Sequence, residues 1–398
     1  MTVFIIDAVR TARGRGNDKS ALKPLRPLDL ARHVFDAVRQ RQSLDTSQVD
    51  DALIGCATQC GEQGSGIARL IALHAGWSET MNAITINRAC TSGLAAVNLA
   101  SLQAQYGDGL AVAGGIEMMC RVTMGADQGP MFVDRALQTS IPLVPLGISA
   151  DALASLHGLS REDCDAYAAE SQRRAAQARE QGWFSSLLPV VDNDGQVLLA
   201  QDETIRAGTT AEKLATLEPA FAALGAKGLD AMVAARLGLE RIDHVHHAGN
   251  SPVGADGASL VLLASEGAAQ RLGLKPRARI VAMADTGSSP LTAHDGAVAA
   301  SRKALARAGL SVDDIDLFEV NEAFAAPMLH YMTALAVPHE RFNVNGGAIA
   351  LGHAMGSTGS ALLGTLLDEL ERRKLRRGLV AVSGAAGVAV ATIIERTT

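Results

Sequence analysis

The sequence is poor in aromatic residues and has no surplus of positive charge. Only 3% of its 398 residues are aromatic, whereas alanine and glycine are abundant, and this composition favours helices packed closely on sheets over an aromatic-rich β-sandwich. A net charge of −6 offers no basic surplus for binding a phosphodiester backbone, so we expect no nucleic-acid partner. A soluble α/β protein is therefore the starting expectation.

Long apolar runs are also missing from the sequence. No uninterrupted apolar stretch approaches the roughly 18 to 20 residues that a membrane-spanning helix needs. The first apolar run, VFII, meets Asp7 and is typical of a first strand, not of a signal peptide. We therefore expect a cytoplasmic protein that does not bind membranes.

Cysteines are few, scattered and odd in number, which argues against a disulfide framework. Cys56 and Cys60 form a C-x-x-x-C pair, but no second cysteine pair or nearby histidine completes a zinc site, so we expect no bound metal. A redox function is disfavoured because the chain contains no C-x-x-C pair. The five cysteines are Cys56, Cys60, Cys90, Cys120 and Cys164.

The sequence contains an internal repeat. In its first half, VFIIDAVRT, LARHVFDAVRQ and LDTSQVDDALIGCAT are typical of a strand, an amphipathic helix, and an acidic turn that leads into another strand. The segments ARIVAMADTG, AVAASRKALARAGL and SVDDIDLFEVNEAFA follow the same order in the second half. Alternating strands and helices predict sheets that are covered on both faces. We therefore predict a duplicated, layered α/β fold with two similar βαβ-rich halves.

Residues 121–245 have no counterpart in the second half and are predicted to form an inserted loop domain. This insertion contains a charged helical stretch, SREDCDAYAAESQRRAAQARE, and a hairpin-like piece, LLPVVDNDGQVLLAQ. The N-terminal half is predicted to span residues 1–120, with residues 246–268 returning to it, and the C-terminal half residues 269–398. Long insertions at one edge of such a body often cover a ligand site.

Two turns at equivalent positions of the repeat carry residues that could do chemistry. Cys90 in NRACTSGLAAV precedes a helix, whose N-terminus would stabilise a thiolate and lower its pKa. His353 in NVNGGAIALGHAMGSTGSA lies among glycines that allow close approach of a ligand. If the halves pack about a pseudo-twofold axis, the two residues can meet as nucleophile and base. Each also has a structural explanation, because a free cysteine is usually a buried hydrophobe.

Asn321 in FEVNEAFAA is a third candidate, at the end of an apolar strand. It either caps the following helix or orients a catalytic water or an oxyanion.

Together, these segments resemble the thiolase family. NRACTSGLAAV resembles its nucleophile motif, FEVNEAFAA its NEAF motif, and NVNGGAIALGHAMGSTG its GHPxGxSG motif, in the same order along essentially the full chain.

The resemblance implies an acyltransferase of fatty acid metabolism that acts on acyl-coenzyme A or 3-ketoacyl-coenzyme A thioesters. Coenzyme A would be a substrate or product, no cofactor would be bound permanently, and the protein would be a homodimer or homotetramer.

The resemblance also implies roles for single residues. Cys90 would attack the thioester and hold the acyl group, His353 would take its proton, and Asn321 would position a water. The thioester oxygen is expected near Cys90, Asn321, His353 and Ala385. Coenzyme A is expected near His247, Asn250, Ser251 and Pro252.

The sequence departs from the family pattern in three places. No cysteine follows Cys164, although the family usually has a second cysteine near the C-terminus. Alignment from ATIIE places Ser383 there and alignment on GVA places Ala381; the repeat register favours Ser383. Because a serine hydroxyl is a far weaker acid than a thiol, we expect carbon–carbon bond formation or cleavage to be impaired or rerouted through Ser383. Ala354 replaces the proline that usually follows the histidine, and Pro252 falls where many members have a serine.

Two other functions are compatible with these departures. One is a non-catalytic or altered thiolase-like subunit that binds acyl-coenzyme A without turnover. The other is a thioester hydrolase, in which water resolves the acyl-cysteine and free coenzyme A is released without a second acyl substrate.

Overall fold

The repeat in the sequence is a repeat of sheet topology in the computed structural model, which describes residues 2–397. Both copies run parallel, antiparallel and antiparallel from the outer strand inward. The first copy has the order β3 (Val49–Gly55), β5 (Leu110–Met118), β9 (Ala255–Ser265), β1 (Val3–Thr11), and the second β11 (Leu317–Val320), β12 (Arg377–Ser383), β13 (Val388–Arg396), β10 (Ala278–Gly287). The predicted duplicated α/β fold is therefore confirmed.

The two copies meet at the centre of one continuous sheet. Strands β1 and β10 pair antiparallel there, with Phe4 opposite Arg279 and Ile5 opposite Ala278. At the outer edge of the first copy, β4 (Asn82–Ile86) adds a strand parallel to β3. The short strand β2 (Gly14–Arg15) pairs with β9.

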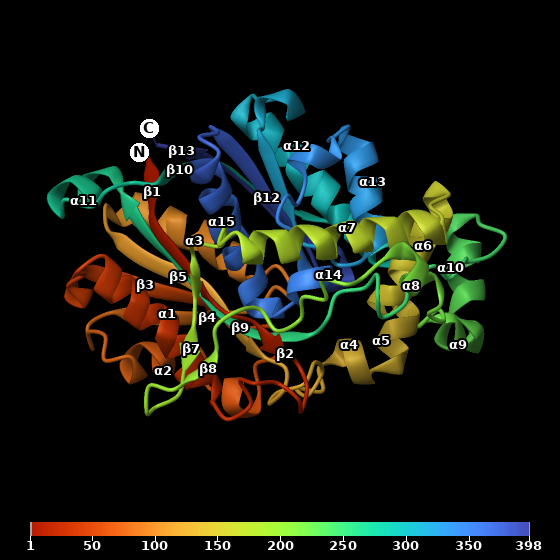
Figure 1. Cartoon of the computed structure of the whole chain (residues 1–398), viewed down its shortest axis with the longest axis horizontal. Helices are drawn as coiled ribbons and strands as arrows, with labels where there is room; N and C mark the ends of the chain where they lie inside the picture. The colour runs from red at the N-terminus through yellow and green to blue at the C-terminus, as the bar shows by residue number, and fades with distance from the viewer. Residues whose placement is uncertain (1, 398) are drawn as a thin grey trace.

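Helices divide the fold into layers, and each layer of helices has its own apolar core. The outer helices of the first copy are α1 (Pro27–Arg41) and α2 (Ile67–His74), and those of the second are α12 (Gly296–Ala308) and α13 (Ala325–Leu335). Between the copies lie α3 (Ser92–Gly107) and α15 (Met355–Arg372), which Figure 1 shows side by side near the middle of the molecule. Their shared core includes residues from both copies of the sheet, so this middle layer joins the halves.

Small residues allow α3 and α15 to approach closely. A Cβ added at Gly93 would lie 2.6 Å from the Gly356 carbonyl oxygen, and one added at Gly359 would lie 2.6 Å from the Leu94 nitrogen. Both distances are shorter than a carbon can tolerate, so the contact needs glycine on each helix. The N-terminal turns of the two helices are thereby held against each other.

The segment 121–245 lies outside the repeat and is mostly helical. It contains the predicted long helix, α7 (Arg161–Glu180), which begins with a capping box at Ser160, and the predicted hairpin, β7 (Val190–Val191) with β8 (Val197–Leu199). Strand β6 (Leu187–Leu188) pairs with β1, so part of the segment adds to the sheet. Its other helices are α4 (Pro130–Val133), α5 (Arg135–Ser140), α6 (Leu146–His157), α8 (Ala211–Ala215), α9 (Ala222–Leu224) and α10 (Asp230–Leu237).

Two short helices complete the set: α11 (Glu266–Arg271), which follows β9, and α14 (Ala348–Leu351), which precedes α15. Within residues 2–397, no helix combines the length and the apolar character that a membrane span requires.

Candidate active site

Cys90 lies in the tight turn that leads from β4 into α3. The side-chain oxygen of Asn87 accepts a hydrogen bond from the Ala89 N–H at 2.9 Å, and the Ser92 hydroxyl accepts one from the Arg88 N–H at 2.8 Å. Ala89 has a φ of +48°, a conformation that few non-glycine residues adopt. These constraints hold Cys90 in one orientation, with its side chain buried in the middle layer.

Burial controls the acidity of the Cys90 thiol. It raises the pKa to about 12, and the nearby Glu117 carboxylate adds to the rise. The main-chain N–H groups of Ala385 and of Cys90 itself donate toward the sulfur and oppose the rise. The expectation that the helix N-terminus would lower this pKa is therefore wrong, because desolvation outweighs the favourable amides. At neutral pH Cys90 is a thiol that needs a base to become a nucleophile.

His353 lies in the equivalent turn of the second copy, just before α15. Its Nδ1 is 2.8 Å from the Thr358 hydroxyl, and its main-chain N–H donates to the Val253 carbonyl at 2.7 Å. Burial, followed by the positive charge of Arg13, lowers the pKa of the imidazole to about 3. Arg13 is fixed there by a 3.2 Å hydrogen bond to the Gly352 carbonyl. The ring is therefore neutral at neutral pH and has a nitrogen free to accept a proton.

The two turns converge. The Glu117 carboxylate accepts a hydrogen bond from the Gly356 N–H at 2.9 Å, in the second copy, while its charge also acts on Cys90 in the first. Together with the Gly93–Gly356 contact, this places the starts of α3 and α15 against each other. Within the described chain, no hydrogen bond joins the Cys90 sulfur to the His353 ring. Direct proton transfer between them stays a prediction.

Ser383 ends β12 beside the Cys90 turn. A Cβ added at the next residue, Gly384, would lie 3.3 Å from the Cys90 nitrogen. The Ser383 hydroxyl is buried and has no hydrogen-bond partner. Ala381, the other alignment choice, lies inside the strand in the core of the second copy, where its carbonyl accepts the Asn321 N–H at 3.0 Å. The structure therefore favours Ser383 as the residue near the sulfur.

Asn321 follows β11 and has both side-chain amide atoms buried without a hydrogen-bond partner. An unsatisfied buried amide costs free energy unless a ligand or a water pairs with it. Asn321 does not cap the following helix in the predicted way, because the residue before α13 is Phe324. This amide and the Ser383 hydroxyl are two buried polar groups available to a bound molecule.

A cavity of about 870 Å³ opens beside the Cys90 turn, and Ala385, whose amide faces the sulfur, is part of its wall. This volume is in the range of pockets that bind small molecules. Two apolar stretches of the insertion, within MGADQGPMFV and PLVPLGISA, line the cavity, as do three cationic side chains. The residues of these two groups are Met124, Met131, Phe132, Leu143, Val144, Pro145 and Leu146, and Arg135, Lys227 and Arg236.

Two of the four residues expected near coenzyme A, His247 and Asn250, are hydrogen-bonded to Asp165 of the insertion. His247 Nε2 lies 2.7 Å from an Asp165 carboxylate oxygen, and Asn250 Nδ2 donates to the same oxygen at 2.8 Å. The Ser251 hydroxyl is buried and unpaired, and Pro252 is partly exposed. None of these four described residues lines the cavity. Their expected contact with coenzyme A stays a prediction.

Family models match both halves of the chain. Residues 3–228 match the thiolase N-terminal domain, and residues 274–396 match the thiolase C-terminal domain. The chain belongs to the thiolase family. It is 40% identical over 405 residues to a 3-ketoacyl-CoA thiolase of Serratia proteamaculans, with 99% of each chain covered. It is 39% identical to one of Klebsiella pneumoniae and 38% identical to one of Aliivibrio fischeri, with the same coverage.

Three residues of this thiolase site were missed by sequence reasoning. Glu117 accepts hydrogen bonds from main-chain N–H groups of both copies, Thr358 contacts the His353 ring, and Arg13 places a charge beside it. Glu117 had a usable signal, since it is a carboxylate inside the apolar run AGGIEMM. Thr358 lies within the GHAMGSTG motif. Arg13 follows the first strand, and no pattern in the sequence indicates a role in the site, because only the fold brings its side chain to the Gly352 carbonyl.

Proposed function

We propose that this chain is a thiolase-type acyltransferase that takes the acyl group of an acyl-coenzyme A or 3-ketoacyl-coenzyme A thioester onto Cys90. One observation carries the proposal. The Cys90 sulfur accepts a hydrogen bond from the Ala385 main-chain N–H, and Ala385 is part of the wall of a cavity large enough for an acyl thioester. The printed names of the relatives support the same class of substrate. Coenzyme A is then a substrate or product, and no permanently bound cofactor takes part.

In acyl transfer from a simple acyl-coenzyme A, the Cys90 sulfur attacks the thioester carbon. A bond from the Cys90 sulfur to the acyl carbon forms, and the bond from that carbon to the sulfur of coenzyme A breaks. The thiol proton moves to His353 and then to the departing coenzyme A sulfur. His353 can accept this proton at Nε2 because its Nδ1 is engaged by Thr358. Dividing the exchange into two substitutions through an acyl-enzyme lowers each barrier.

The oxygen of the thioester gains negative charge during the attack. We assign its stabilisation to the main-chain N–H groups of Cys90 and Ala385, to the side chain of Asn321 acting through a water, and to His353 once it is protonated. A donor fixed in advance at such an oxygen is worth roughly 3 to 4 kcal/mol. The unpaired amide of Asn321 and the amide donors at the sulfur support this assignment.

Ser383 makes the second half of the reaction slower than the first. Carbon–carbon bond formation or cleavage requires a group that gives and takes a proton at carbon, and a serine hydroxyl exchanges protons poorly near neutral pH. The acyl-cysteine therefore forms readily and is resolved slowly. We propose that the remaining proton exchange runs through the buried, unpaired Ser383 hydroxyl.

The acyl-enzyme is tested by intact-protein mass measurement after incubation with short, long and branched acyl-coenzyme A donors. We expect the mass to rise by one acyl group in the wild type and to stay constant in Cys90→Ser. If no donor gives an adduct, the chain is a binder and the proposal is wrong. If coenzyme A is released continuously without a second acyl substrate, the chain is a hydrolase.

The role of Ser383 is tested by Ser383→Cys. Restoring a thiol should raise the rate of thiolysis of a 3-ketoacyl-coenzyme A donor and leave acylation of Cys90 by a simple acyl-coenzyme A unchanged. The matched control is Ala381→Cys, which places the thiol two residues earlier in the strand. An equal rise in both variants, or none in Ser383→Cys, would show that the proton exchange runs elsewhere.

We further propose that two copies associate along β4. This strand is at the edge of the sheet, and large apolar side chains are exposed on it and on the adjacent α3, among them Ile84, Leu99 and Leu102. An unpaired edge with exposed apolar neighbours is a surface that a second chain can cover. Sedimentation analysis should give a dimer or a dimer of dimers for the wild type and a monomer for Ile84→Lys. A cytoplasmic location and a role in fatty acid metabolism stay predictions.

A further inference from the structure

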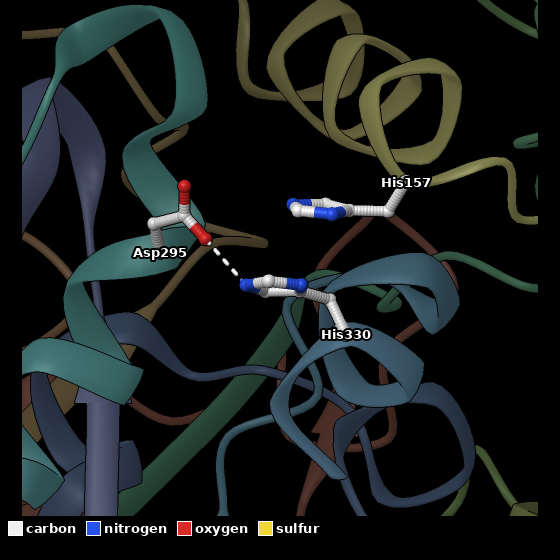
Figure 2. Close-up of side chains that lie close together, drawn as sticks. All are labelled: His157, Asp295 and His330. Atoms are coloured by element: carbon white, nitrogen blue, oxygen red, sulfur yellow. Dashed lines mark ion pairs between the residues drawn. The ribbon is translucent and has the colours of Figure 1, made fainter. Parts of the chain in front are cut away.

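A second cluster of potential ligand groups lies away from Cys90. It consists of His157, the last residue of α6, His330 on α13, and Asp295, the last residue of the 3-10 helix η4 (Pro290–Asp295). Their ligand atoms all lie within 4.8 Å of one another. Figure 2 shows both imidazoles pointing from their helices toward the Asp295 carboxylate. These three residues lie far apart in the sequence, and the expectation of no bound metal rested on Cys56 and Cys60 alone.

The cluster places two stacked imidazoles beside one carboxylate. His330 Nε2 lies 2.7 Å from an Asp295 oxygen, and the His157 and His330 rings are stacked with centroids 3.9 Å apart and an interplanar angle of 21°. Two imidazoles this close repel each other when both are charged. A neutral imidazole carries the lone pair that a metal ion requires.

We propose that His157, Asp295 and His330 together bind one divalent transition-metal ion, of which zinc is the representative. Two imidazoles and a carboxylate are a ligand set that zinc, cobalt and nickel accept, whereas magnesium and calcium prefer oxygen ligands only. The carboxylate gives the empty cluster a negative charge that attracts a cation. A fourth position stays open for water.

Binding requires side-chain movements, because the stacked rings must tilt before a nitrogen of each points at one ion. In a tetrahedral site with bonds of about 2.0 to 2.2 Å, ligand atoms are about 3.3 Å apart, so atoms now separated by up to 4.8 Å must close by about 1.5 Å. His157 is exposed at a helix end, and the Asp295 side chain is 32% exposed, so both can rotate toward an ion. The open side also lets the ion enter from solvent.

The position of the cluster assigns the ion a structural role. Helix α6 and η4 both begin at the large cavity, where Leu146 and Pro290 line the wall, and both end at the cluster, in His157 and Asp295. A helix of 12 residues is about 17 Å long, so the ion lies far from the cavity end of α6. Binding would tie this helix of the insertion to the second copy of the repeat, through α13.

The experiment is a titration of metal-free protein with zinc, followed by calorimetry, and with cobalt, followed by its visible spectrum. The wild type should bind one ion at this site, with a tetrahedral cobalt spectrum. His157→Gln and Asp295→Asn should weaken binding at least about 10-fold, since a lost ligand or supporting group typically costs 10- to 100-fold. At a free zinc concentration of about 100 times Kd, the wild type should melt about 3 °C higher.

Two controls separate this site from others. His74→Gln removes a histidine that lies 2.9 Å from an Asp29 carboxylate oxygen but belongs to no such cluster of three ligand groups in the described residues, and it should leave zinc affinity unchanged. Cys90→Ser should also leave it unchanged. Because His157 is exposed at the end of its helix, His157→Gln is expected to fold, which the melting temperature without metal checks. Equal affinity of His157→Gln and wild type, loss of binding in Cys90→Ser, or no binding at all would overturn the proposal.

Discussion

The turn before α3 and the turn before α15 occupy the same place in two copies of one topology, yet they carry opposite chemistry. Burial raises the pKa of Cys90 to about 12 and lowers that of His353 to about 3, so it favours the neutral form of both groups. The thiol keeps its proton and the imidazole stays able to accept it. The duplicated fold thus brings a neutral thiol from one copy and a neutral imidazole from the other to the contact between the copies, and proton transfer between them stays a prediction.

The largest effect is expected from removing the donor. Cys90→Ala deletes the nucleophile and should lower acyl transfer by roughly 10⁴-fold or more, because the other groups of the site cannot replace a covalent intermediate. The acyl adduct should vanish from the intact-protein mass. The circular dichroism melting curve should change little, since alanine fits the space of a buried cysteine. A residual adduct elsewhere in the chain would show that another residue is acylated.

Removing the proton acceptor, His353, should lower the rate of acyl transfer by less than removing Cys90 does. We expect His353→Asn to lower acyl transfer by roughly 10²- to 10⁴-fold, the usual range for a lost general base. In the wild type, the pKa of about 3 also means that the imidazole does not become protonated between pH 5 and 8, so its titration should leave no inflection in the acylation rate there. Single-turnover acylation across this pH range checks both points, with Thr358→Val as a milder variant that keeps the ring. A full loss of rate below pH 6 would contradict the lowered pKa.

The contact between the copies can be broken through its glycines. Gly93→Ala places a carbon 2.6 Å from the Gly356 carbonyl oxygen, and overpacking of this kind costs about 1 to 3 kcal/mol. The free energy of unfolding in urea should fall by about that amount. Gly107→Ala is the control on the same helix, because its added carbon meets open space and should leave stability equal or slightly higher. Equal losses in both variants would mean that the Gly93–Gly356 contact does not set the cost.

Local patterns in the sequence were enough to predict the repeat, the two turns and the long helix of the insertion. Periodicity and turn residues act within about ten residues, and the parallel pairs β3–β5 and β11–β12 occupy matching places in the two copies that they indicated. The sign of the Cys90 pKa shift was missed because it depends on burial between two helices, one of which is far away in sequence. Hydrogen bonds of His247 and Asn250 to Asp165 could not be inferred either, since sequence spacing carries no information on that pairing.

The opposite pKa shifts of His353 and Cys90 should make the free energy of unfolding fall in two separate pH ranges, one acid and one alkaline. The unfolded state binds more protons than the folded state between the folded pKa of His353, about 3, and its ordinary value of 6.5, so stability from this group falls as pH drops through that window. For Cys90 the folded state binds more protons between 9.0 and about 12, so its contribution falls as pH rises there. Each slope is at most about 1.4 kcal/mol per pH unit. Urea unfolding should show a flatter acid limb in His353→Asn and a flatter alkaline limb in Cys90→Ser.

The smallest effect concerns the backbone of the two turns. Both use a positive φ, but the first turn places Ala89 at +48° and the second places Gly352 at +81°. Ala89→Gly should therefore stabilise the protein by less than about 1 kcal/mol, because the strain of the left-handed alanine is offset by the extra freedom of glycine in the unfolded chain. Gly352→Ala is the opposite change: it adds strain and puts a carbon 2.7 Å from the Ala255 side chain, so it should destabilise the fold. Chemical denaturation of both variants measures the difference, and a loss of stability in Ala89→Gly would show that the positive φ of Ala89 carries no net strain.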